Sequence, residues 1–353
     1  MNNFLKIAVA IASCTAAALS AASIPTDADR AARTFAKEGV SYWNEYETRI
    51  GRPMQKWACQ ELGRPEAGIV FYPFSGPDLP TAVHLFPEAE RYVLVSMEKA
   101  EPPPPLEKMS PRELESYAAD FRKAWRLYGS LGFFRTQDLQ AIENSPGPGV
   151  GITGALMVFA VRLGFEVESV EPLRLDAGTN DVVPLRDEVL SDDNWDSVRL
   201  TLRKGGRQVL VDYVRLDLRD GWVGKLPGAH GWIDRMSENP TILKAASHLP
   251  EDPEFRIVRN SILWNAPLII QDETGIDYAA LAGAFTVRLY GRFTKPNGSF
   301  NPMLQHSLAL AYRTGGPAVK PLPFRLGYEK NAGSAMQVAI RNTSWQPERR
   351  NCR

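Results

Sequence analysis

The sequence contains little of the two residue types that mark metal centres and disulfide scaffolds. Its 353 residues include three Cys and four His. The four His are scattered along the chain, at positions 84, 230, 248 and 306. No Cys-x-x-Cys pair occurs, so the pattern indicates neither a zinc site nor a disulfide-rich fold. We therefore expect no metal and no cofactor.

An excess of charge of either sign is also absent. Lys and Arg number 41, and so do Asp and Glu. No general basic excess is available to attract nucleic acid. Hydrophobic residues make up 44% and charged residues 23%, which excludes disordered and collagen-like chains. The length fits about two domains or one large one.

A long hydrophobic run occurs only at the N-terminus. Lys6 precedes an apolar stretch, Ile7–Ala22, whose end is crowded with small residues. This pattern is typical of a secretory signal peptide, and Ser20 and Ala22 suit the positions before a cleavage site. The run is too short and too rich in Ala, Ser and Thr for a membrane anchor. We predict a signal peptide over residues 1–22 and no transmembrane segment after its removal.

An alternative is lipoprotein processing. Ile11-Ala12-Ser13-Cys14 resembles a bacterial lipobox, which would anchor the protein through Cys14. Both alternatives predict export, to the periplasm or beyond the cell. Cleavage after Ala22 leaves 40 basic and 41 acidic residues and two cysteines, Cys59 and Cys352. An oxidising compartment allows these two to form a disulfide, and the alternative is two unpaired thiols.

The mature chain, residues 23–353, reads as a single α/β domain. It begins with a helical segment over 26–62, which Gly39 and Gly51-Arg52-Pro53 interrupt. Its candidate inward-facing residues are Phe35, Val40, Trp43, Tyr46 and Ile50.

A β-α-β core follows over about 66–172. An apolar strand over 68–72, a loop Pro73–Asp78, a helix Leu79–Phe86 and a strand over 92–97 predict a parallel pair. Ser110 and Glu113 form a capping box at the start of a further helix. A mostly apolar helix over 151–163 leads into a strand.

From about 182 to 341 the pattern becomes antiparallel. Two alternating runs, 198–202 and 209–213, flank Gly205-Gly206, a strong hairpin signal. The remaining predicted elements are a helix over 240–265, strands over 266–270 and 285–290, and a closing antiparallel pair formed by 322–328 and 336–340. The expected fold is a three-layer, Rossmann-like α/β fold with a mixed sheet and an antiparallel hairpin extension.

The loop after the first strand is the main candidate site. A glycine loop there, with an acidic residue ending the second strand, resembles the nucleotide or S-adenosylmethionine site of Rossmann-like methyltransferases. Gly76 would lie against the ligand and Glu98 would hold ribose hydroxyls. However, Pro73 and Pro77 remove two backbone donors. The alternative is a tight turn in which Asp78 caps the following helix.

A hydrolase provides a second interpretation of the same loop. Ser75 occupies the place of a strand-to-helix nucleophile, and Asp272 and His306 complete the order Ser, Asp, His. Prolines stand at both glycine positions of the usual elbow. His84, on the apolar helix after the loop, is a weak catalytic candidate and is better explained as a packed core residue.

Polar residues also follow the strand that ends near position 270. Asp272 and Glu273 could bind a cation or act as acid and base, but neighbours on an extended chain point in opposite directions. The alternative is a turn in which Asp272 and Thr274 bond backbone amides. Arg135 is a further binding candidate, in a segment that otherwise reads as a helix cap.

Four segments together resemble a family of uncharacterised exported bacterial proteins. They are FYPFSGPD over 71–78, FFRT over 133–136, QDETGI over 271–276 and LPFRLGY over 322–328. The resemblance covers most of residues 65–330. It implies a bacterial source and one co-folded unit, and it transfers no catalytic residues.

These observations predict an exported cell-envelope protein that binds an unknown small molecule or an envelope partner. The alternative is a hydrolase or transferase with its site at strand ends near 73–78, 98 and 271–275. The sequence leaves open whether the protein is an enzyme.

Overall fold

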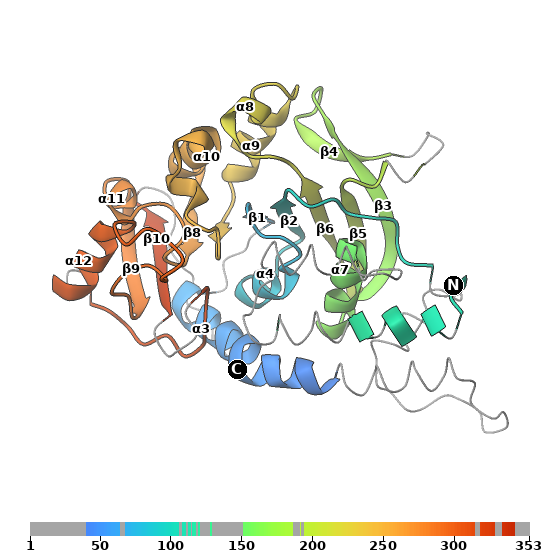
Figure 1. Cartoon of the computed structure of the whole chain (residues 1–353), viewed down its shortest axis with the longest axis horizontal. Coiled ribbons are helices and arrows are strands. Elements are labelled where there is room, and N and C mark those ends of the chain that lie inside the picture. Colours follow the sequence, from blue (N-terminus) through green and yellow to red (C-terminus); the bar gives the residue numbers. More distant parts are fainter. Residues whose placement is uncertain are drawn as a thin grey trace.

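Figure 1 shows the structure, a computed structural model. It describes residues 40–63, 68–105, 108–110, 112–113, 115–117, 119–120, 128, 151–185, 191, 194–314, 318–328 and 334–342. The predicted signal peptide, Arg135, the FFRT segment and Cys352 lie outside these residues.

One ten-stranded sheet runs through the described part of the chain, in the order β4-β3-β5-β6-β2-β1-β7-β8-β10-β9. Its five central strands, from β6 to β8 in that order, are parallel, and both flanks are antiparallel. The strands are β1 (Ile69–Tyr72), β2 (Arg91–Ser96), β3 (Glu166–Asp176), β4 (Asp181–Pro184), β5 (Val198–Lys204), β6 (Arg207–Arg215), β7 (Thr241–Leu243), β8 (Leu268–Gln271), β9 (Phe285–Gly291) and β10 (Ala335–Arg341).

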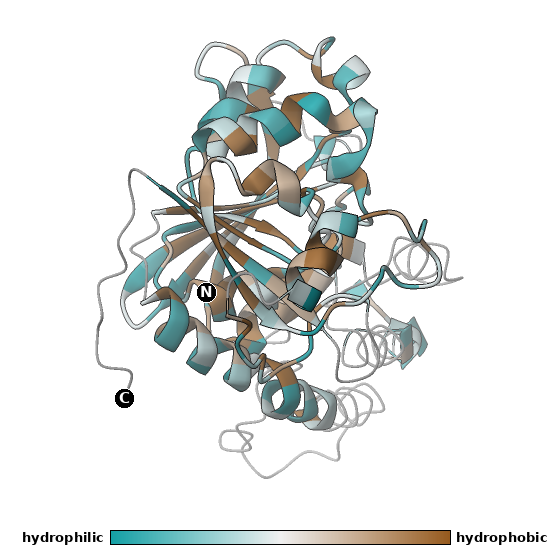
Figure 2. Ribbon diagram, turned by 90° about the vertical axis from the view of Figure 1, so that its left-hand side faces the viewer, coloured by the Kyte–Doolittle hydropathy of each residue, from teal (hydrophilic) through white to brown (hydrophobic). Residues whose placement is uncertain are grey.

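Helices cover both faces of this sheet (Figures 1 and 2). One face carries the helical residues 40–46, the π-helical turn η1 (Glu47–Gly51), α3 (Arg52–Leu62), α4 (Leu79–Leu85) and α7 (Gly151–Arg162). The other carries α8 (Asp220–Val223), α9 (Ala229–Ser237), α10 (Arg256–Asn265), α11 (Tyr278–Leu281) and α12 (His306–Thr314), with two short 3-10 turns, η4 (Leu249–Glu251) and η5 (Pro253–Phe255).

Each central strand contributes to two hydrophobic cores. On β1, Val70 and Tyr72 pack with α3 and α4, whereas Phe71 packs with α9 and α10 on the opposite face. Successive side chains of a strand point to opposite faces, so a strand covered on both sides must be apolar throughout. The fold is therefore a three-layer α/β fold with a mixed sheet, as the sequence predicts.

The predictions that rest on local pattern are confirmed. β1 and β2 are parallel, with α4 between them in the chain. Gly205 and Gly206 both have positive φ, at 57° and 80°, and join β5 to β6 in a hairpin. In the capping box, the Ser110 backbone N–H donates to Glu113 Oε2 over 2.7 Å, and the Glu113 N–H donates to Ser110 Oγ.

The helix predicted over 240–265 is wrong in its first half. Residues Thr241–Leu243 form β7, a central parallel strand, and the α-helix is confined to Arg256–Asn265, α10, which follows the 3-10 turns η4 and η5. Three buried residues are too few for any hydrophobic period, and Pro250 and Pro253 interrupt the stretch that follows. Helices α8 and α9 were not among the predicted elements.

Two further predictions are corrected. The 322–328 segment is not a strand, and β10 pairs with β8 and β9 instead. Pro321 and Pro323 remove backbone donors that a paired strand would need. Gly51-Arg52-Pro53 does not break the N-terminal helix either. The π-helical turn bridges into α3, where Pro53 occupies the first turn and needs no hydrogen bond of its own.

Candidate functional site

The chain changes direction across the sheet between β1 and β7. From β1 it continues through α4 to β2 on one side, and from β7 through α10 to β8 on the other. The two helices lie on opposite faces of the sheet. At such a point the connections diverge beyond the carboxyl ends of the strands, where open α/β sheets bind their ligands. A ligand site is therefore expected at the carboxyl ends of β1 and β7.

A buried ion pair lies there. Lys244, the residue after β7, places Nζ 2.8 Å from Oδ2 of Asp78 and 2.7 Å from Oγ1 of Thr81. The side chains of Lys244 and Asp78 are only 3% and 1% exposed. Tyr72 donates its hydroxyl to Asp78 Oδ2 over 2.8 Å, and Tyr128 donates to Oδ1 over 2.6 Å. Both carboxyl oxygens thus have partners, which a charge removed from water requires.

The two tyrosines are suited to this donating role. Burial raises the pKa of Tyr72 and of Tyr128 well above the ordinary value, and the nearby charge of Asp78 raises both further. Both hydroxyls therefore keep their protons and act as donors to Asp78.

Asp78 does not cap α4, which corrects the structural alternative drawn from the sequence. It occupies the N-cap position, but its side chain makes no capping hydrogen bond. A capping side chain bonds the second or third backbone N–H of the helix, and Pro80, in this first turn, has none. The carboxyl group turns instead to Lys244, which follows a different strand.

Asp272, which follows β8, holds the same region from the other side. Its Oδ1 accepts from the backbone N–H and the hydroxyl of Thr274, over 2.8 and 2.6 Å. The predicted bond from Asp272 to a backbone amide is therefore confirmed, whereas the Thr274 side chain bonds Asp272 and not an amide. Its Oδ2 accepts from the N–H of Ala245 over 2.7 Å. Burial raises the pKa of Asp272, although the hydrogen bonds from Thr274 and Ala245 and the charge of Lys244 oppose this.

Backbone strain is concentrated at these strand ends. After β7, Ala245, Ser247 and His248 have φ values of 54°, 54° and 61°. After β1, Phe74 and Gly76 have φ values of 60° and 55°. Residues other than glycine rarely adopt this conformation, and such strain is concentrated at sites that bind or react.

A third segment completes the arrangement. Gly327 has a φ of 69°, and a Cβ there would lie 2.4 Å from Oδ2 of Asp272. The hydroxyls of Tyr328 and Ser247 are 2.6 Å apart. The segments over 71–78, 271–276 and 322–328, which stand far apart in the sequence, therefore all contact residues 244–248. We call these four segments together the strand-end site.

An aromatic cluster adjoins residues 244–248. The His248 ring packs edge-on against Phe300 with centroids 4.8 Å apart, and Phe300 packs edge-on against Tyr328 at 5.2 Å. His248 Nδ1 lies 2.7 Å from Oε1 of Glu251. Ser247, Phe300 and Tyr328 are partly exposed, whereas His248 is buried.

The proposed order Ser75, Asp272, His306 does not appear as a triad among the described contacts. Ser75 is buried, and its hydroxyl donates to the carbonyls of Gly76 and Val95 over 2.9 and 3.4 Å. The oxygens of Asp272 accept from Thr274 and Ala245. His306 is exposed at the start of α12. Within the described residues, no hydrogen bond or ion pair joins these three side chains.

His84 is a packed core residue, as the sequence analysis favours. It is buried on α4, with Nε2 2.8 Å from Oε1 of Glu47 in the π-helical turn. Burial, together with the positive charges of Lys204 and Lys244, lowers the pKa of His84 to about 3. A Cβ at position 51 would meet its ring at 2.1 Å, so Gly51 makes room for this contact.

The other acidic candidates lie in separate surroundings. Glu98 accepts a hydrogen bond from the Ser96 hydroxyl, and Tyr213 donates to the Glu98 carbonyl over 3.0 Å. Glu273 is buried. Burial raises the pKa of Tyr312 on α12, and the charge of Glu273 contributes to the increase. Among the residues that the structure describes, no cluster of His, Cys, Asp and Glu could hold a metal ion.

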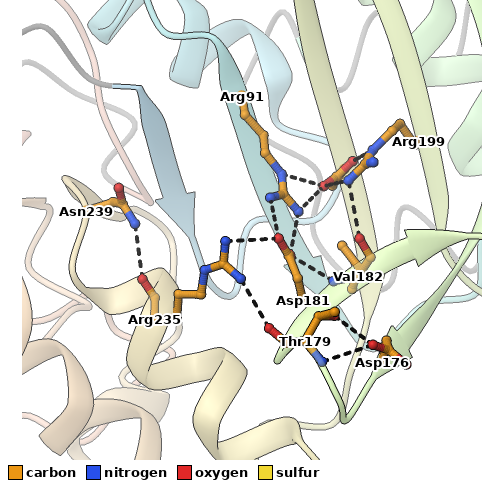
Figure 3. Close-up of polar contacts among 9 residues, drawn as sticks. Arg91, Asp176, Thr179, Asp181, Val182, Arg199, Arg235 and Asn239 are labelled. Carbon is orange, nitrogen blue, oxygen red and sulfur yellow. Dashed lines mark hydrogen bonds and ion pairs between the residues drawn. The ribbon is translucent and has the colours of Figure 1, made fainter.

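A second buried charge cluster lies away from these strand ends (Figure 3). Asp212 on β6 is fully buried and accepts from Arg91 and Arg199 over 2.6 to 2.7 Å. Arg91 also holds Asp181 of β4 through two hydrogen bonds, and Arg235 of α9 approaches Asp181 to 3.5 Å. Each acid is matched to arginines, so this cluster ties the β3–β4 hairpin to the sheet and to α9.

Most of the strand-end site is not predicted by the sequence pattern. Lys244, Ser247 and His248 lay in a segment predicted to be helical, and Tyr72 was read only as the end of a strand. One signal was present: Lys244 interrupts an otherwise apolar stretch, and a lysine in such a place is rarely buried without a partner.

Comparison with models of known protein families, with curated proteins and with solved structures finds no match. None of the described helices combines the length and the apolar character that crossing a membrane requires.

Proposed function

We propose that this chain is an exported cell-envelope protein, periplasmic or secreted, that binds a small molecule or an envelope partner at the strand-end site. The observation that carries the proposal is the convergence of three separate segments on residues 244–248, at the point where the chain changes direction across the sheet. Export rests on the N-terminal sequence, with residues 1–22 as a cleaved signal peptide or Cys14 as a lipidated residue.

The cost of this arrangement supports a role beyond folding. Burying a lysine and an aspartate removes two charges from water, and apolar residues of similar volume are often at least as stable. Three left-handed residues in a row of four add backbone strain. Ordinary packing of β7 requires neither feature, whereas a rigid, pre-organised binding edge uses both.

Binding is better supported than the alternative of a hydrolase or transferase. The Ser75 hydroxyl is engaged with backbone carbonyls, and Asp78 is surrounded by Tyr72, Tyr128 and Lys244. The Glu98 carboxylate, which the nucleotide interpretation assigns to ribose hydroxyls, already accepts from the Ser96 hydroxyl.

Native mass spectrometry of the protein recovered from an exporting bacterium tests the proposal. We expect a mature chain that begins at Ser23 and carries a non-covalent adduct that denaturation releases. Tyr328→Phe, which removes only the hydroxyl facing Ser247, should reduce the adduct. Tyr278→Phe on α11 is the control and should retain it.

Two results would contradict parts of the proposal. A wild-type protein without any adduct, whose thermal stability also does not respond to extracts of its own cell envelope, argues against binding. A precursor that keeps residues 1–22 argues against export, whereas a lipid-modified Cys14 replaces free release by anchoring.

A further inference from the structure

His248 is held in one orientation by its neighbours. Its Nδ1 lies 2.7 Å from Oε1 of Glu251, and its side chain is only 4% exposed. A carboxylate can only accept, so Nδ1 of His248 carries a proton, and in the neutral tautomer Nε2 then carries a lone pair. The backbone N–H of His248 donates to the Thr274 carbonyl over 3.0 Å, and Phe300 packs against the ring. The ring is therefore held in one orientation, and in its neutral form Nε2 is an acceptor.

That acceptor is not used within the protein. Nε2 of His248 is buried and has no hydrogen-bond partner among the described residues. Buried polar atoms in native proteins nearly always have a partner, and one without a partner requires an explanation. The other imidazole of the core, that of His84, uses its Nε2 on Glu47. His248 thus combines an oriented ring, a buried acceptor and a strained backbone.

The surroundings of His248 favour a neutral, hydroxylated ligand. Its partly exposed neighbours are Phe300, Ser247 and Tyr328, and the last two bring their hydroxyls together. Of the charged side chains nearby in the sequence, Lys244 is paired with Asp78, and Glu251 accepts a hydrogen bond from His248 itself. Hydroxyls can donate to and accept from other hydroxyls, and aromatic rings pack against the C–H faces of a sugar ring.

We propose that Nε2 of His248 accepts a hydrogen bond from a hydroxyl of a neutral sugar ring, which packs against Phe300 and Tyr328 at the strand-end site. This inference deepens the proposed function and rests on it. Glu251 acts as a positioning residue because its contact with Nδ1 leaves Nε2 as the nitrogen that can accept.

His248→Asn isolates the Nε2 atom. The Asn amide nitrogen replaces Nδ1 and can still donate to Glu251, whereas nothing replaces Nε2. Asn also tolerates the left-handed φ of this position better than most residues. His230→Asn on α9 is the matched control, because that side chain is 61% exposed.

The probes are three neutral trisaccharides, maltotriose, cellotriose and chitotriose, titrated separately into the full-length mature protein. Calorimetry measures affinity, and ¹⁵N spectra of the histidine rings report on Nε2. We expect at least one probe to bind and to shift the His248 Nε2 signal. His248→Asn should weaken that binding about tenfold or more, the loss expected when a buried acceptor is removed. His230→Asn should not change it.

The outcomes separate this inference from the proposed function. If none of the trisaccharides binds the wild-type protein, the sugar assignment is wrong, even where native mass spectrometry finds another ligand. If a probe binds equally well to wild type and to a folded His248→Asn, the role of Nε2 is wrong while the binding site stands. If neither probes nor adducts are found, the proposed function fails as well.

Discussion

Lys244 Nζ lies 2.8 Å from Oδ2 of Asp78, at the point between β1 and β7 where the chain changes direction across the sheet. The two residues follow different strands and are 166 positions apart in the chain. Asp78 stands at the start of a helix, where an aspartate commonly serves as a cap, and it is used instead as the partner of a buried lysine. The pair therefore couples the end of β1 to the end of β7.

Replacing Asp78 by Asn distinguishes these two roles. Asn caps helices about as well as Asp, so a capping role predicts almost no change in stability. The ion pair predicts a loss of about 3–5 kcal/mol in the free energy of unfolding, because the Lys244 charge stays buried without its partner. Urea unfolding followed by circular dichroism measures the difference.

The double variant Asp78→Asn with Lys244→Met is the control for that experiment. It removes both charges together, so it should be more stable than Asp78→Asn alone. Equal stability of wild type and Asp78→Asn would contradict the role of the ion pair.

The fold was largely predictable because its signals are local. The Gly205-Gly206 hairpin, the parallel β1–β2 pair and the Ser110 capping box each depend on a few neighbouring residues. β7 is not predicted because a strand of three residues is too short to show a hydrophobic periodicity. Its pairing with β1 and β8 also depends on segments that are distant in the sequence. The strand-end site was missed for the same reason.

Single residues of the site were nevertheless visible in the sequence. Asp78, Asp272 and Gly76 were singled out because polar residues and glycine at strand ends are typical of α/β sites. Their partners could not be found in this way. Contacts such as Lys244 to Asp78 and Tyr328 to Ser247 exist only after the sheet has formed.

Acid should weaken the attachment of the β3–β4 hairpin. Burial by itself raises the pKa of Asp181, but the hydrogen bonds and charge of Arg91 outweigh it, so the pKa is lowered. A lowered folded-state pKa contributes stability above the unfolded value of about 3.9, and this is lost as the pH falls through the folded-state value. We expect Asp181→Asn to be less stable at neutral pH and to lose less stability on acidification. Urea unfolding at several pH values measures this, and an unchanged acid slope would contradict it.

Cys59 and Cys352 are predicted to form a disulfide in the exported protein. Cys59 lies half-buried on α3 and has an interaction partner. Cys352 lies outside the described residues, so the pairing of these two cysteines stays a prediction. Such a bond would enclose most of the chain and stabilise the fold by up to about 5 kcal/mol on chain-entropy grounds. Peptide mapping of non-reduced protein should recover the linked peptides. Free thiols at both positions would contradict the prediction.

The contact between Gly327 and Asp272 can be separated from backbone strain by comparing two glycines. Gly327 and Gly205 both have left-handed backbones, with φ of 69° and 57°. A Cβ at 205 would meet nothing within 4 Å, whereas one at 327 would lie 2.4 Å from Oδ2 of Asp272. Gly205→Ala should therefore show only the conformational cost, about 1–2 kcal/mol.

Gly327→Ala should lose a further 1–3 kcal/mol, roughly the cost of forcing extra volume into a packed site. The added methyl would push Asp272 away from Ala245 and so move the segment that carries Lys244 and His248. Urea unfolding of both variants measures the difference, and the adduct seen by native mass spectrometry should decrease in Gly327→Ala alone. Equal losses of stability in the two variants would show that Asp272 does not depend on the space that Gly327 leaves.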